Sequence, residues 1–358
     1  MNKLSVAVIF GGISSEHEVS RVSASSVLNN LDKDKYDIHM IGITKSGKWL
    51  YYTGDINNLK DGTWEKDKNN LPACISPDRS VKGIYIFKSN EIETIKIDVV
   101  FPVLHGKYGE DGTIQGLFEL AGLPYVGCNT TSSAVCMDKV FTNTVLDSAN
   151  ISQAKWLWFN KYDYNENKDK IIDQIDEKLG YPCFIKPANA GSSVGIGKAK
   201  NKQQLDEIIK NALIHDNRIV VEEGIDGIEV ECAVLGNDKP IASVVGEIVP
   251  ANEFYDYEAK YSSEDSLLYI PARLNENIMQ SIRLTAVKAY CALGCEGMSR
   301  VDFFVRKNDN KILLNEVNTI PGFTSISMYP KLFNASGINY SELLNKLIEL
   351  AIERAENR

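Results

Sequence analysis

Short apolar runs that end at turn residues dominate the first third of the chain. Leu4–Phe10 is largely apolar and ends at Gly11-Gly12, as is typical of a buried parallel strand that enters a loop. Two later runs, Asp37–Thr44 and Ile97–Leu104, predict further strands. Helical spacing of apolar and small residues predicts helices over Glu18–Leu31 and Thr113–Ala121. This order predicts an open parallel sheet with helices on both faces.

The stretch Trp49–Glu93 is more polar and contains turn signals such as Asp61-Gly62, so we expect an irregular, β-rich excursion from the first domain there. Beyond residue 130 the pattern predicts five helices, over Ser132–Asn150, Asp163–Leu179, Gln203–Ala212, Glu276–Leu293 and a last stretch capped by Asn339. It predicts strands over Cys183–Lys186, Arg218–Glu222, Glu229–Leu235, Ile241–Ile248, Ser299–Arg306 and Lys311–Glu316. We therefore expect an α/β protein with domains at residues 1–129, 130–220 and 221–358.

Composition narrows the class of protein. A chain of 358 residues with 44% hydrophobic content is long enough for two or three packed domains. The net charge of -9 argues against a nucleic-acid partner, although it leaves room for a phosphate site with local cations. Apolar runs stay well short of the ~20 residues of a membrane span. The start lacks the features of a signal peptide and the seven cysteines are scattered, so we expect buried thiols in a cytoplasmic protein.

A glycine- and serine-rich loop follows the strand that ends at Lys186. Its sequence, from Pro187 through Gly197, offers backbone N–H groups and hydroxyls that can surround phosphate oxygens, with Lys186 as the cation. Its spacing matches neither the P-loop nor a dinucleotide-binding fingerprint. A purely structural hairpin is the alternative, because glycine and serine are common in turns.

Acidic residues mark the end of the next strand. Val220-Val221 runs into Glu222-Glu223-Gly224, and Glu229 follows seven residues after Glu222. Carboxylates at a strand end can accept hydrogen bonds from a ribose. The alternative is that these are solvated acids at a strand terminus.

Two later strands gather polar groups of a different kind. Alternation places Arg300 and Asp302 on one face of the first strand, and Glu316 and Asn318 on one face of the second. Hard oxygen ligands in this number suit Mg²⁺ that bridges nucleotide phosphates.

With these features the chain resembles the D-alanine–D-alanine ligase family of ATP-grasp enzymes nearly from end to end. Seven segments carry the resemblance in the family's order: Phe10–Ser20, Leu104–Gly112, Cys136–Lys139, Lys186–Gly195, Tyr255–Tyr261, Ser299–Asp302 and Asn315–Gly322. The resemblance implies an N-terminal substrate domain plus a two-domain ATP-grasp clamp. It implies that Lys139, Lys186 and Ser193 bind phosphates and that Glu222, Glu223 and Glu229 bind the nucleotide. It also implies that Asp302, Glu316 and Asn318 hold two Mg²⁺ ions, for which Mn²⁺ can substitute.

The family's reaction makes D-alanyl-D-alanine for peptidoglycan precursors. The carboxylate of a first D-alanine attacks the γ-phosphoryl of ATP, and the amine of a second then attacks the acyl phosphate. By resemblance, Arg300 and the Gly322 N–H hold the tetrahedral oxyanion, and Glu16 binds the first ammonium. Glu16 could instead simply cap a helix. His105 is assigned to the substrate site because it ends a strand of an open sheet.

The same resemblance predicts a lid over Asn252–Ser266 that excludes water, closed by hydrogen bonds among Tyr261, Ser192 and Glu16. Ser327 and Lys260 would receive the carboxylate of the second substrate, beside Met328. The lid tyrosine Tyr261 favours peptide over ester formation.

The chain also resembles the D-alanine–D-serine ligases of glycopeptide resistance, at Tyr51–Gly54, Arg79–Gly83 and Cys232–Gly236. Those enzymes usually carry an arginine where this chain has Met328, so D-alanine is favoured as the second substrate, with D-serine as the alternative. Two other functions fit the sequence less well. A biotin-dependent carboxylase subunit would be longer, and an inactive nucleotide-binding regulator would have lost phosphate or metal residues that this chain keeps. A homodimer through the N-terminal domain is usual for the family.

Overall fold

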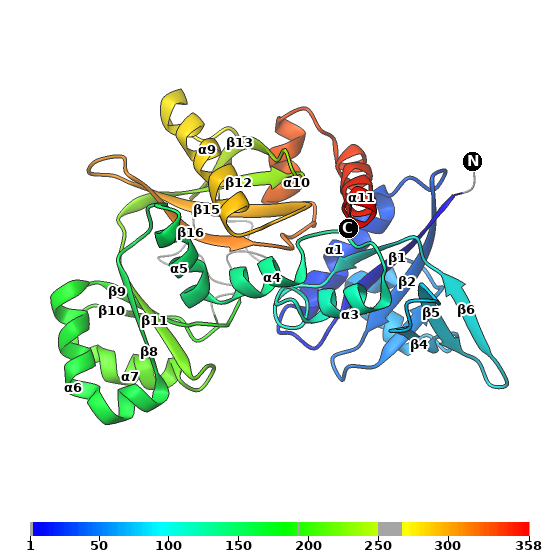
Figure 1. Ribbon diagram of the computed structural model, residues 1–358, viewed down its shortest axis with the longest axis horizontal. Coiled ribbons are helices and arrows are strands. Elements are labelled where there is room, and N and C mark those ends of the chain that lie inside the picture. The colour runs from blue at the N-terminus through cyan, green and yellow to red at the C-terminus, as the bar shows by residue number, and fades with distance from the viewer. Residues whose placement is uncertain (1–2, 192–193, 250–266, 358) are drawn as a thin grey trace.

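Three β-sheets organise the chain in the computed structural model, which describes residues 3–191, 194–249 and 267–357. Figure 1 shows the first sheet at one end of the molecule, the second at the other, and the third between and above them. The three sheets follow one another along the chain, so each corresponds to a separate stretch of sequence.

The first sheet has seven strands in the order β6-β5-β4-β3-β2-β1-β7. Their bounds are β1 Leu4–Gly11, β2 Tyr36–Ile43, β3 Trp49–Tyr52, β4 Leu71–Ile75, β5 Gly83–Phe87, β6 Ile92–Lys96 and β7 Val99–Val103. The helical elements of this part are α1 His17–Asn30, α2 Asn58–Asp61, the 3-10 helix η1 Thr63–Lys66 and α3 Thr113–Ala121.

This sheet is mixed rather than wholly parallel. Only β2, β1 and β7 are parallel to one another, and β3 to β6 extend the sheet in antiparallel pairs. The strands for which a parallel sheet was predicted are parallel, whereas the stretch over residues 49–93, predicted as an irregular, β-rich excursion, forms regular strands that belong to the same sheet. Antiparallel addition needs only short turns, whereas each parallel strand requires a long crossover.

Strand β1 is largely apolar because both of its faces are buried from Val6 onward. Val6, Val8 and Phe10 join one core cluster, whereas Ala7 and Ile9 join the cluster on the opposite face. The first cluster includes residues of the last helix, α11 (Tyr340–Glu356), which returns from the end of the chain to cover the N-terminal sheet (Figure 1). This packing fixes the N-terminal sheet against the C-terminal part of the chain.

The second sheet has four antiparallel strands in the order β10-β9-β11-β8. Its elements are β8 Trp156–Asn160, α6 Lys161–Lys178, β9 Cys183–Pro187, β10 Gly197–Ala199, α7 Lys202–Ala212 and β11 Arg218–Glu223. Both helices cover one face of this sheet through a core of aliphatic side chains such as Ile175, Ile185 and Leu205.

The third sheet has five antiparallel strands in the order β14-β13-β12-β15-β16. Its elements are β12 Gly227–Leu235, β13 Ile241–Val249, β14 Leu267–Tyr269, α9 Glu276–Ala292, β15 Met298–Arg306, β16 Ile312–Asn318 and α10 Met328–Ala335.

The helix predicted over Ser132–Asn150 is two helices, α4 Thr130–Met137 and α5 Lys139–Ser148. Asp138 separates them because its backbone is extended and its side chain accepts hydrogen bonds from the N–H groups of Val140 and Phe141, which caps α5. The break orients Lys139 at the first position of α5. The domain boundaries at 129/130 and 220/221 stay predictions.

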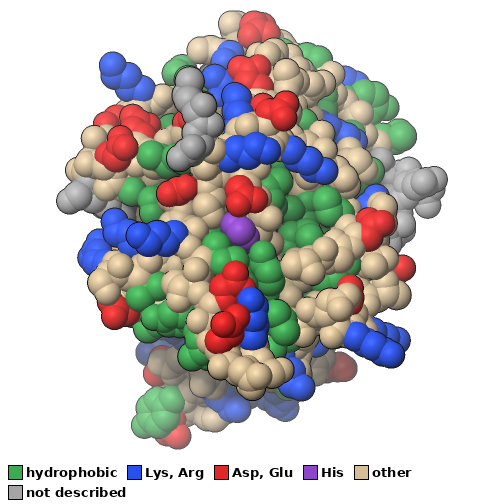
Figure 2. Space-filling model, turned by 90° about the vertical axis from the view of Figure 1, so that its right-hand side faces the viewer, with side chains coloured by type: hydrophobic (Ala, Val, Ile, Leu, Met, Phe, Trp, Pro, Cys, Tyr) green, Lys and Arg blue, Asp and Glu red, His purple; other side chains and the backbone are tan. Residues whose placement is uncertain are grey.

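The surface carries charges of both signs. On the face drawn in Figure 2, acidic and basic side chains are interspersed, and no continuous basic area is visible. Among the residues that the structure describes, no helix is both long enough and apolar enough to cross a membrane.

Candidate active site

Two adjoining cavities lie between the sheets. The first, which we name the nucleotide cleft, measures about 440 Å³ and is lined by β9, by the ends of β11 and by the facing strands of the third sheet, including Phe184, Lys186, Glu222 and Phe304. The second, the catalytic pocket, is lined by residues of the N-terminal domain, α4, α5 and the third sheet, including Glu16, Glu110 and Arg300. Lys139, Asn315 and Glu316 line both cavities. The two cavities therefore meet at a lysine and a carboxylate.

The polar patch predicted on β15 and β16 forms as expected. Arg300 is paired with Asn318 across the two strands, and Asp302 is paired with Glu316. The Arg300 guanidinium donates two hydrogen bonds to Asp302, with Nε–Oδ1 and Nη2–Oδ2 distances of 2.8 and 2.7 Å. Asn318 Nδ2 donates to the same carboxylate at 3.0 Å. This bidentate arrangement holds the guanidinium in one orientation.

A further carboxylate, which the sequence reasoning missed, completes this patch. Glu231 on β12 lies opposite Asp302 in the register, and its Oε2 lies 2.9 Å from Arg300 Nε. Glu231 is buried, so the arginine joins two carboxylates from neighbouring strands in a nearly dry environment. The signal was available, because alternation along β12 puts Glu231 on the same face as Glu229.

Two lysines occupy the border between the cavities. Lys186 Nζ donates to Glu222 Oε2 at 2.6 Å and to Asn315 Oδ1 at 3.5 Å. Lys139 Nζ donates to the Ala190 carbonyl at 2.7 Å, which ties it to the glycine-rich loop. Burial lowers the pKa of Lys139, although the Glu316 carboxylate opposes that change. The structure thus brings together the two predicted phosphate lysines.

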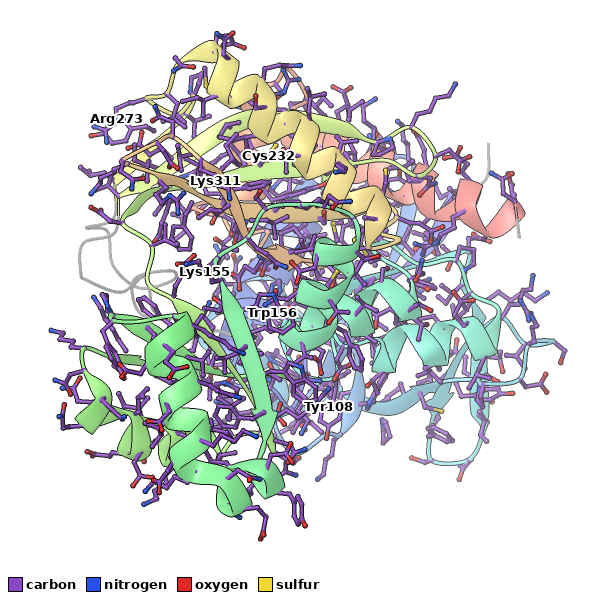
Figure 3. The ribbon with its side chains drawn as sticks, turned by 60° about the vertical axis from the view of Figure 1, so that its left-hand side comes forward. Tyr108, Lys155, Trp156, Cys232, Arg273 and Lys311 are labelled. Carbon is purple, nitrogen blue, oxygen red and sulfur yellow. The ribbon has the colours of Figure 1, made fainter. Side chains whose placement is uncertain are left out.

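The predicted nucleotide-binding acids line the other end of the cleft. Glu222, Glu223 and Glu229 are all among its lining residues. Glu223 accepts a hydrogen bond from the Lys155 N–H at 2.8 Å, and its own N–H donates to the Lys155 carbonyl at 2.9 Å. Figure 3 shows Lys155 and Trp156 where the chain enters β8, between the second and third sheets. Glu223 therefore joins the two connections that link these sheets.

Glu16, which is buried, and Glu110, which is half-buried, form an acidic pair at the N-terminal side of the catalytic pocket. Glu16 precedes α1 without making a side-chain cap, so its side chain is directed to the pocket rather than to the helix end. Glu110 Oε2 accepts the Gly106 N–H at 2.7 Å, and its Oε1 accepts the Ile320 N–H at 3.2 Å. Burial, reinforced by the negative charge of Glu16, raises the pKa of Glu110 to about 8. Glu110 had no role assigned from sequence, although it lies within the quoted Leu104–Gly112 segment.

The raised pKa of Glu110 predicts a pH-dependent stability. In the folded protein the Glu110 carboxyl keeps its proton up to about pH 8. In the unfolded chain the same carboxyl has its ordinary pKa of 4.5 and loses the proton at a lower pH. The contribution of Glu110 to the free energy of unfolding is therefore complete below pH 4.5 and is lost as the pH rises to about 8. Chemical denaturation of Glu110→Gln should give a flatter dependence on pH than wild type in this window. The matched control Glu356→Gln, at the exposed end of α11, should follow wild type; equal slopes for all three proteins would contradict the assignment.

His105 lies behind the pocket lining instead of in it. Its ring is buried and accepts or donates at both nitrogens, with Nδ1 3.1 Å from the Ile320 carbonyl and Nε2 3.2 Å from Ser23 Oγ. Burial lowers its pKa to about 4, so the ring is neutral near pH 7. Because a carbonyl only accepts, Nδ1 carries the proton. His105 thus holds the turn after β16 that carries Gly322, which is itself buried.

Met328 also differs from its expected position. Its side chain is buried in the core of the third sheet, where a Cβ at Gly246 would come within 2.3 Å of its terminal methyl carbon. Ser327 Oγ lies 2.8 Å from Thr324 Oγ1 and accepts the Thr324 N–H at 3.0 Å. Neither residue lines the two cavities described above. Ser192, Ser193, Lys260 and Tyr261, with the predicted lid, lie outside the described residues.

Comparisons with known proteins agree over the whole chain. The family described as D-ala D-ala ligase N-terminus matches residues 5–128, and the one described as D-ala D-ala ligase C-terminus matches residues 145–349. The D-alanine--D-alanine ligase of Acetivibrio thermocellus is 53% identical, over 99% of this chain and 97% of that protein.

The chain belongs to the D-alanine–D-alanine ligase family. The D-alanine--D-alanine ligase B of Clostridium tetani is 54% identical over 98% of this chain and 94% of that protein. Among solved structures, the VanG D-Ala:D-Ser ligase from Enterococcus faecalis superposes with a TM-score of 0.89 at 47% identity, over 98% of this chain and all of that one. The D-alanine-D-alanine ligase from Coxiella burnetii superposes with a TM-score of 0.86 at 37% identity, over 100% of this chain and 96% of that one. These findings confirm the family, the fold class and the enzyme class predicted from the sequence.

The residues on β15 and β16 fit the magnesium that this ligase family implies. Asp302 and Glu316 lie directly opposite each other on neighbouring strands, and both carry the carboxylate oxygens that Mg²⁺ prefers as ligands. Among the described residues no group of three or more His, Cys, Asp or Glu side chains could hold a metal by itself.

Proposed function

We propose that this protein uses ATP to join two D-alanines into D-alanyl-D-alanine, through an acyl phosphate, for peptidoglycan precursor synthesis. The observation that supports this most strongly is the meeting of the nucleotide cleft and the catalytic pocket at Lys139, Asn315 and Glu316. A γ-phosphoryl group at that junction would face a carboxylate bound in the pocket. Phosphoryl transfer depends mainly on positioning and charge neutralisation, which such a junction supplies.

In the first step, the pocket would hold the first D-alanine by its two charged ends. Glu16, buried at the N-terminal wall, would pair with the ammonium, which leaves the carboxylate directed at the phosphoryl group. Lys139 and Lys186 would bind the phosphates, with Ser193 of the glycine-rich loop as a further donor. Asp302, Glu316 and Asn318 would hold two Mg²⁺ ions, which neutralise charge on the phosphates. Glu222, Glu223 and Glu229 would bind the adenosine end.

In the second step, the amine of the second D-alanine attacks the acyl carbon, and the resulting oxyanion needs fixed donors. Arg300 is held by Asp302 and Glu231 and lines the pocket, so it is oriented before substrate arrives. The Gly322 N–H would be the second donor, and His105 fixes its turn from behind. Lys260 and Ser327 would bind the second carboxylate under a lid closed by Tyr261 and Ser192. A homodimer through the N-terminal domain completes the proposal.

D-serine is the alternative second substrate, which the similarity to the VanG D-Ala:D-Ser ligase favours. The sequence argument rested on Met328, whose side chain is buried against Gly246, so Met328 acts on the pocket only through the position of α10. The two substrates differ by one hydroxyl, which an apolar pocket discriminates poorly.

A competition assay tests the choice of second substrate. The protein is incubated with Mg·ATP and D-alanine, with and without a large excess of D-serine, and the dipeptides are identified by mass spectrometry. We expect mainly D-alanyl-D-alanine under both conditions. Mainly D-alanyl-D-serine in the mixture would overturn this assignment while leaving the ligase reaction intact.

A further inference from the structure

Three cysteine thiols meet beside the catalytic pocket. Cys136 lies in the last turn of α4, Cys128 lies just before α4, and Cys295 follows α9. The Sγ atoms of Cys136 and Cys295 are 3.8 Å apart, and Cys128 Sγ donates to the Met298 carbonyl at 3.2 Å. Hydrogen bonding with Cys128 and Cys136, together with burial, raises the pKa of Cys295 well above its usual range. The sequence had suggested only scattered, buried thiols.

The three thiols differ in their access to solvent. Cys128 and Cys295 are buried, whereas Cys136 is half-buried and lines the catalytic pocket. A small reagent that enters the pocket therefore reaches Cys136 first, and Cys295 lies immediately behind it. A disulfide requires the two sulfurs to be about 2.05 Å apart. The observed separation is thus about 1.8 Å too long for a bond, a distance that small side-chain and backbone shifts can close.

We propose that Cys136 and Cys295 are a peroxide-sensitive pair whose oxidation to a disulfide suppresses the reaction in the adjoining pocket. The Cys136 thiolate attacks one oxygen of hydrogen peroxide, breaking the O–O bond, and becomes a sulfenic acid while the other oxygen leaves as water. The Cys295 sulfur then attacks the Cys136 sulfur and displaces a second water. Two thiols lose two electrons and two protons, and one peroxide becomes two waters.

The disulfide would join two walls of the catalytic pocket. Met137 and Lys139, which follow Cys136 directly, line that pocket, and Cys295 lies just before β15, which carries Arg300. The loop of Cys295 has little freedom to move, because a Cβ at Gly297 would already come within 3.1 Å of the Gly127 carbonyl oxygen. The shift therefore falls on the junction of α4 and α5, where Lys139 is held. Misplacing a phosphate-binding group by ~1 Å costs on the order of 10²-fold in rate.

The chain offers a matched pair of variants for the test. Cys295→Ser removes the buried partner, which does not line either cavity, whereas Cys291→Ser removes an exposed thiol four residues earlier on α9. Wild type and both variants are treated with hydrogen peroxide, assayed for ADP release with D-alanine, and then reduced with dithiothreitol. We expect a loss of about 10²-fold in wild type and Cys291→Ser that dithiothreitol reverses. Cys295→Ser should form no disulfide, and its Cys136 should instead accumulate as a sulfenic acid that the carbon nucleophile dimedone labels.

Non-reducing peptide mapping of the oxidised wild-type protein provides a second readout. We expect a single disulfide between the peptides that contain Cys136 and Cys295. Because the mapping uses only the wild-type protein, it does not depend on the folding of any variant. The activity readout rests on the proposed function, whereas the linkage does not, so the two can fail separately. Absence of this linkage, a linkage between Cys128 and Cys295 in its place, or a linked protein with undiminished activity would each overturn the proposal.

Discussion

Replacing Arg300 by lysine should lower kcat by on the order of 10²–10³-fold, the usual loss when one donor to a developing oxyanion is removed. Lysine keeps the positive charge but lacks the planar fork that reaches Asp302 through two nitrogens and Glu231 through Nε. An ammonium in this place would move to one carboxylate and leave the pocket. The buried carboxylates would also be only partly neutralised.

Steady-state kinetics with D-alanine and Mg·ATP measure the effect, and Arg306→Lys is the matched control. Arg306 lies on the same strand and binds Asp309 with the same two-nitrogen geometry, but its side chain lines neither cavity and is more exposed. We expect the control to stay within twofold of wild type. A fully active Arg300→Lys protein with normal folding would remove Arg300 from the reaction.

Replacing Glu316 by glutamine should produce the other large effect, on the dependence of activity on magnesium. Glu316 lines both cavities and faces Asp302 across β15 and β16, so the change removes one of the two carboxylates at the phosphate junction. Substituting residues that merely support a metal ligand costs 10–100-fold in metal affinity or activity. Loss of a ligand itself should therefore raise the Mg²⁺ concentration for half-maximal activity by at least about 10²-fold.

Asp309→Asn is the control for this experiment because Asp309 is an exposed carboxylate on the turn between the same two strands. Magnesium is titrated at fixed ATP and the rate of ADP release is followed. The control should show the wild-type midpoint. An unchanged midpoint in Glu316→Gln would mean that the metal is held elsewhere.

Much of the catalytic patch could be predicted from sequence because strand alternation needs no tertiary information. The placement of Arg300 with Asp302, and of Glu316 with Asn318, follows from a period of two, and the antiparallel register then brings the four together. Lys186 could be placed from its position before the glycine-rich loop, whereas Lys139 could be placed only through the family resemblance, since it depends on the break between α4 and α5.

The positions of the other site residues could not be predicted from local sequence, because they depend on contacts between distant segments of the chain. Glu110 is held by the N–H of Ile320, 210 positions away in the sequence, so no local pattern shows that it is buried and keeps its proton near neutral pH. Met328 follows the strand and turn that carry the site, yet its side chain turns into the core because Gly246 leaves space for it. His105 occupies the strand end expected of a ligand-binding residue but binds a backbone carbonyl instead.

The transfer of an oxygen atom from substrate to phosphate tests the central claim most directly. D-alanine labelled with ¹⁸O in its carboxylate is incubated with the protein and Mg·ATP, and the dipeptide and inorganic phosphate are analysed by mass spectrometry. Because the carboxylate attacks the γ-phosphoryl group, each phosphate should carry one ¹⁸O for each dipeptide formed. Phosphate without ¹⁸O, or ATP hydrolysis without dipeptide, would contradict the account.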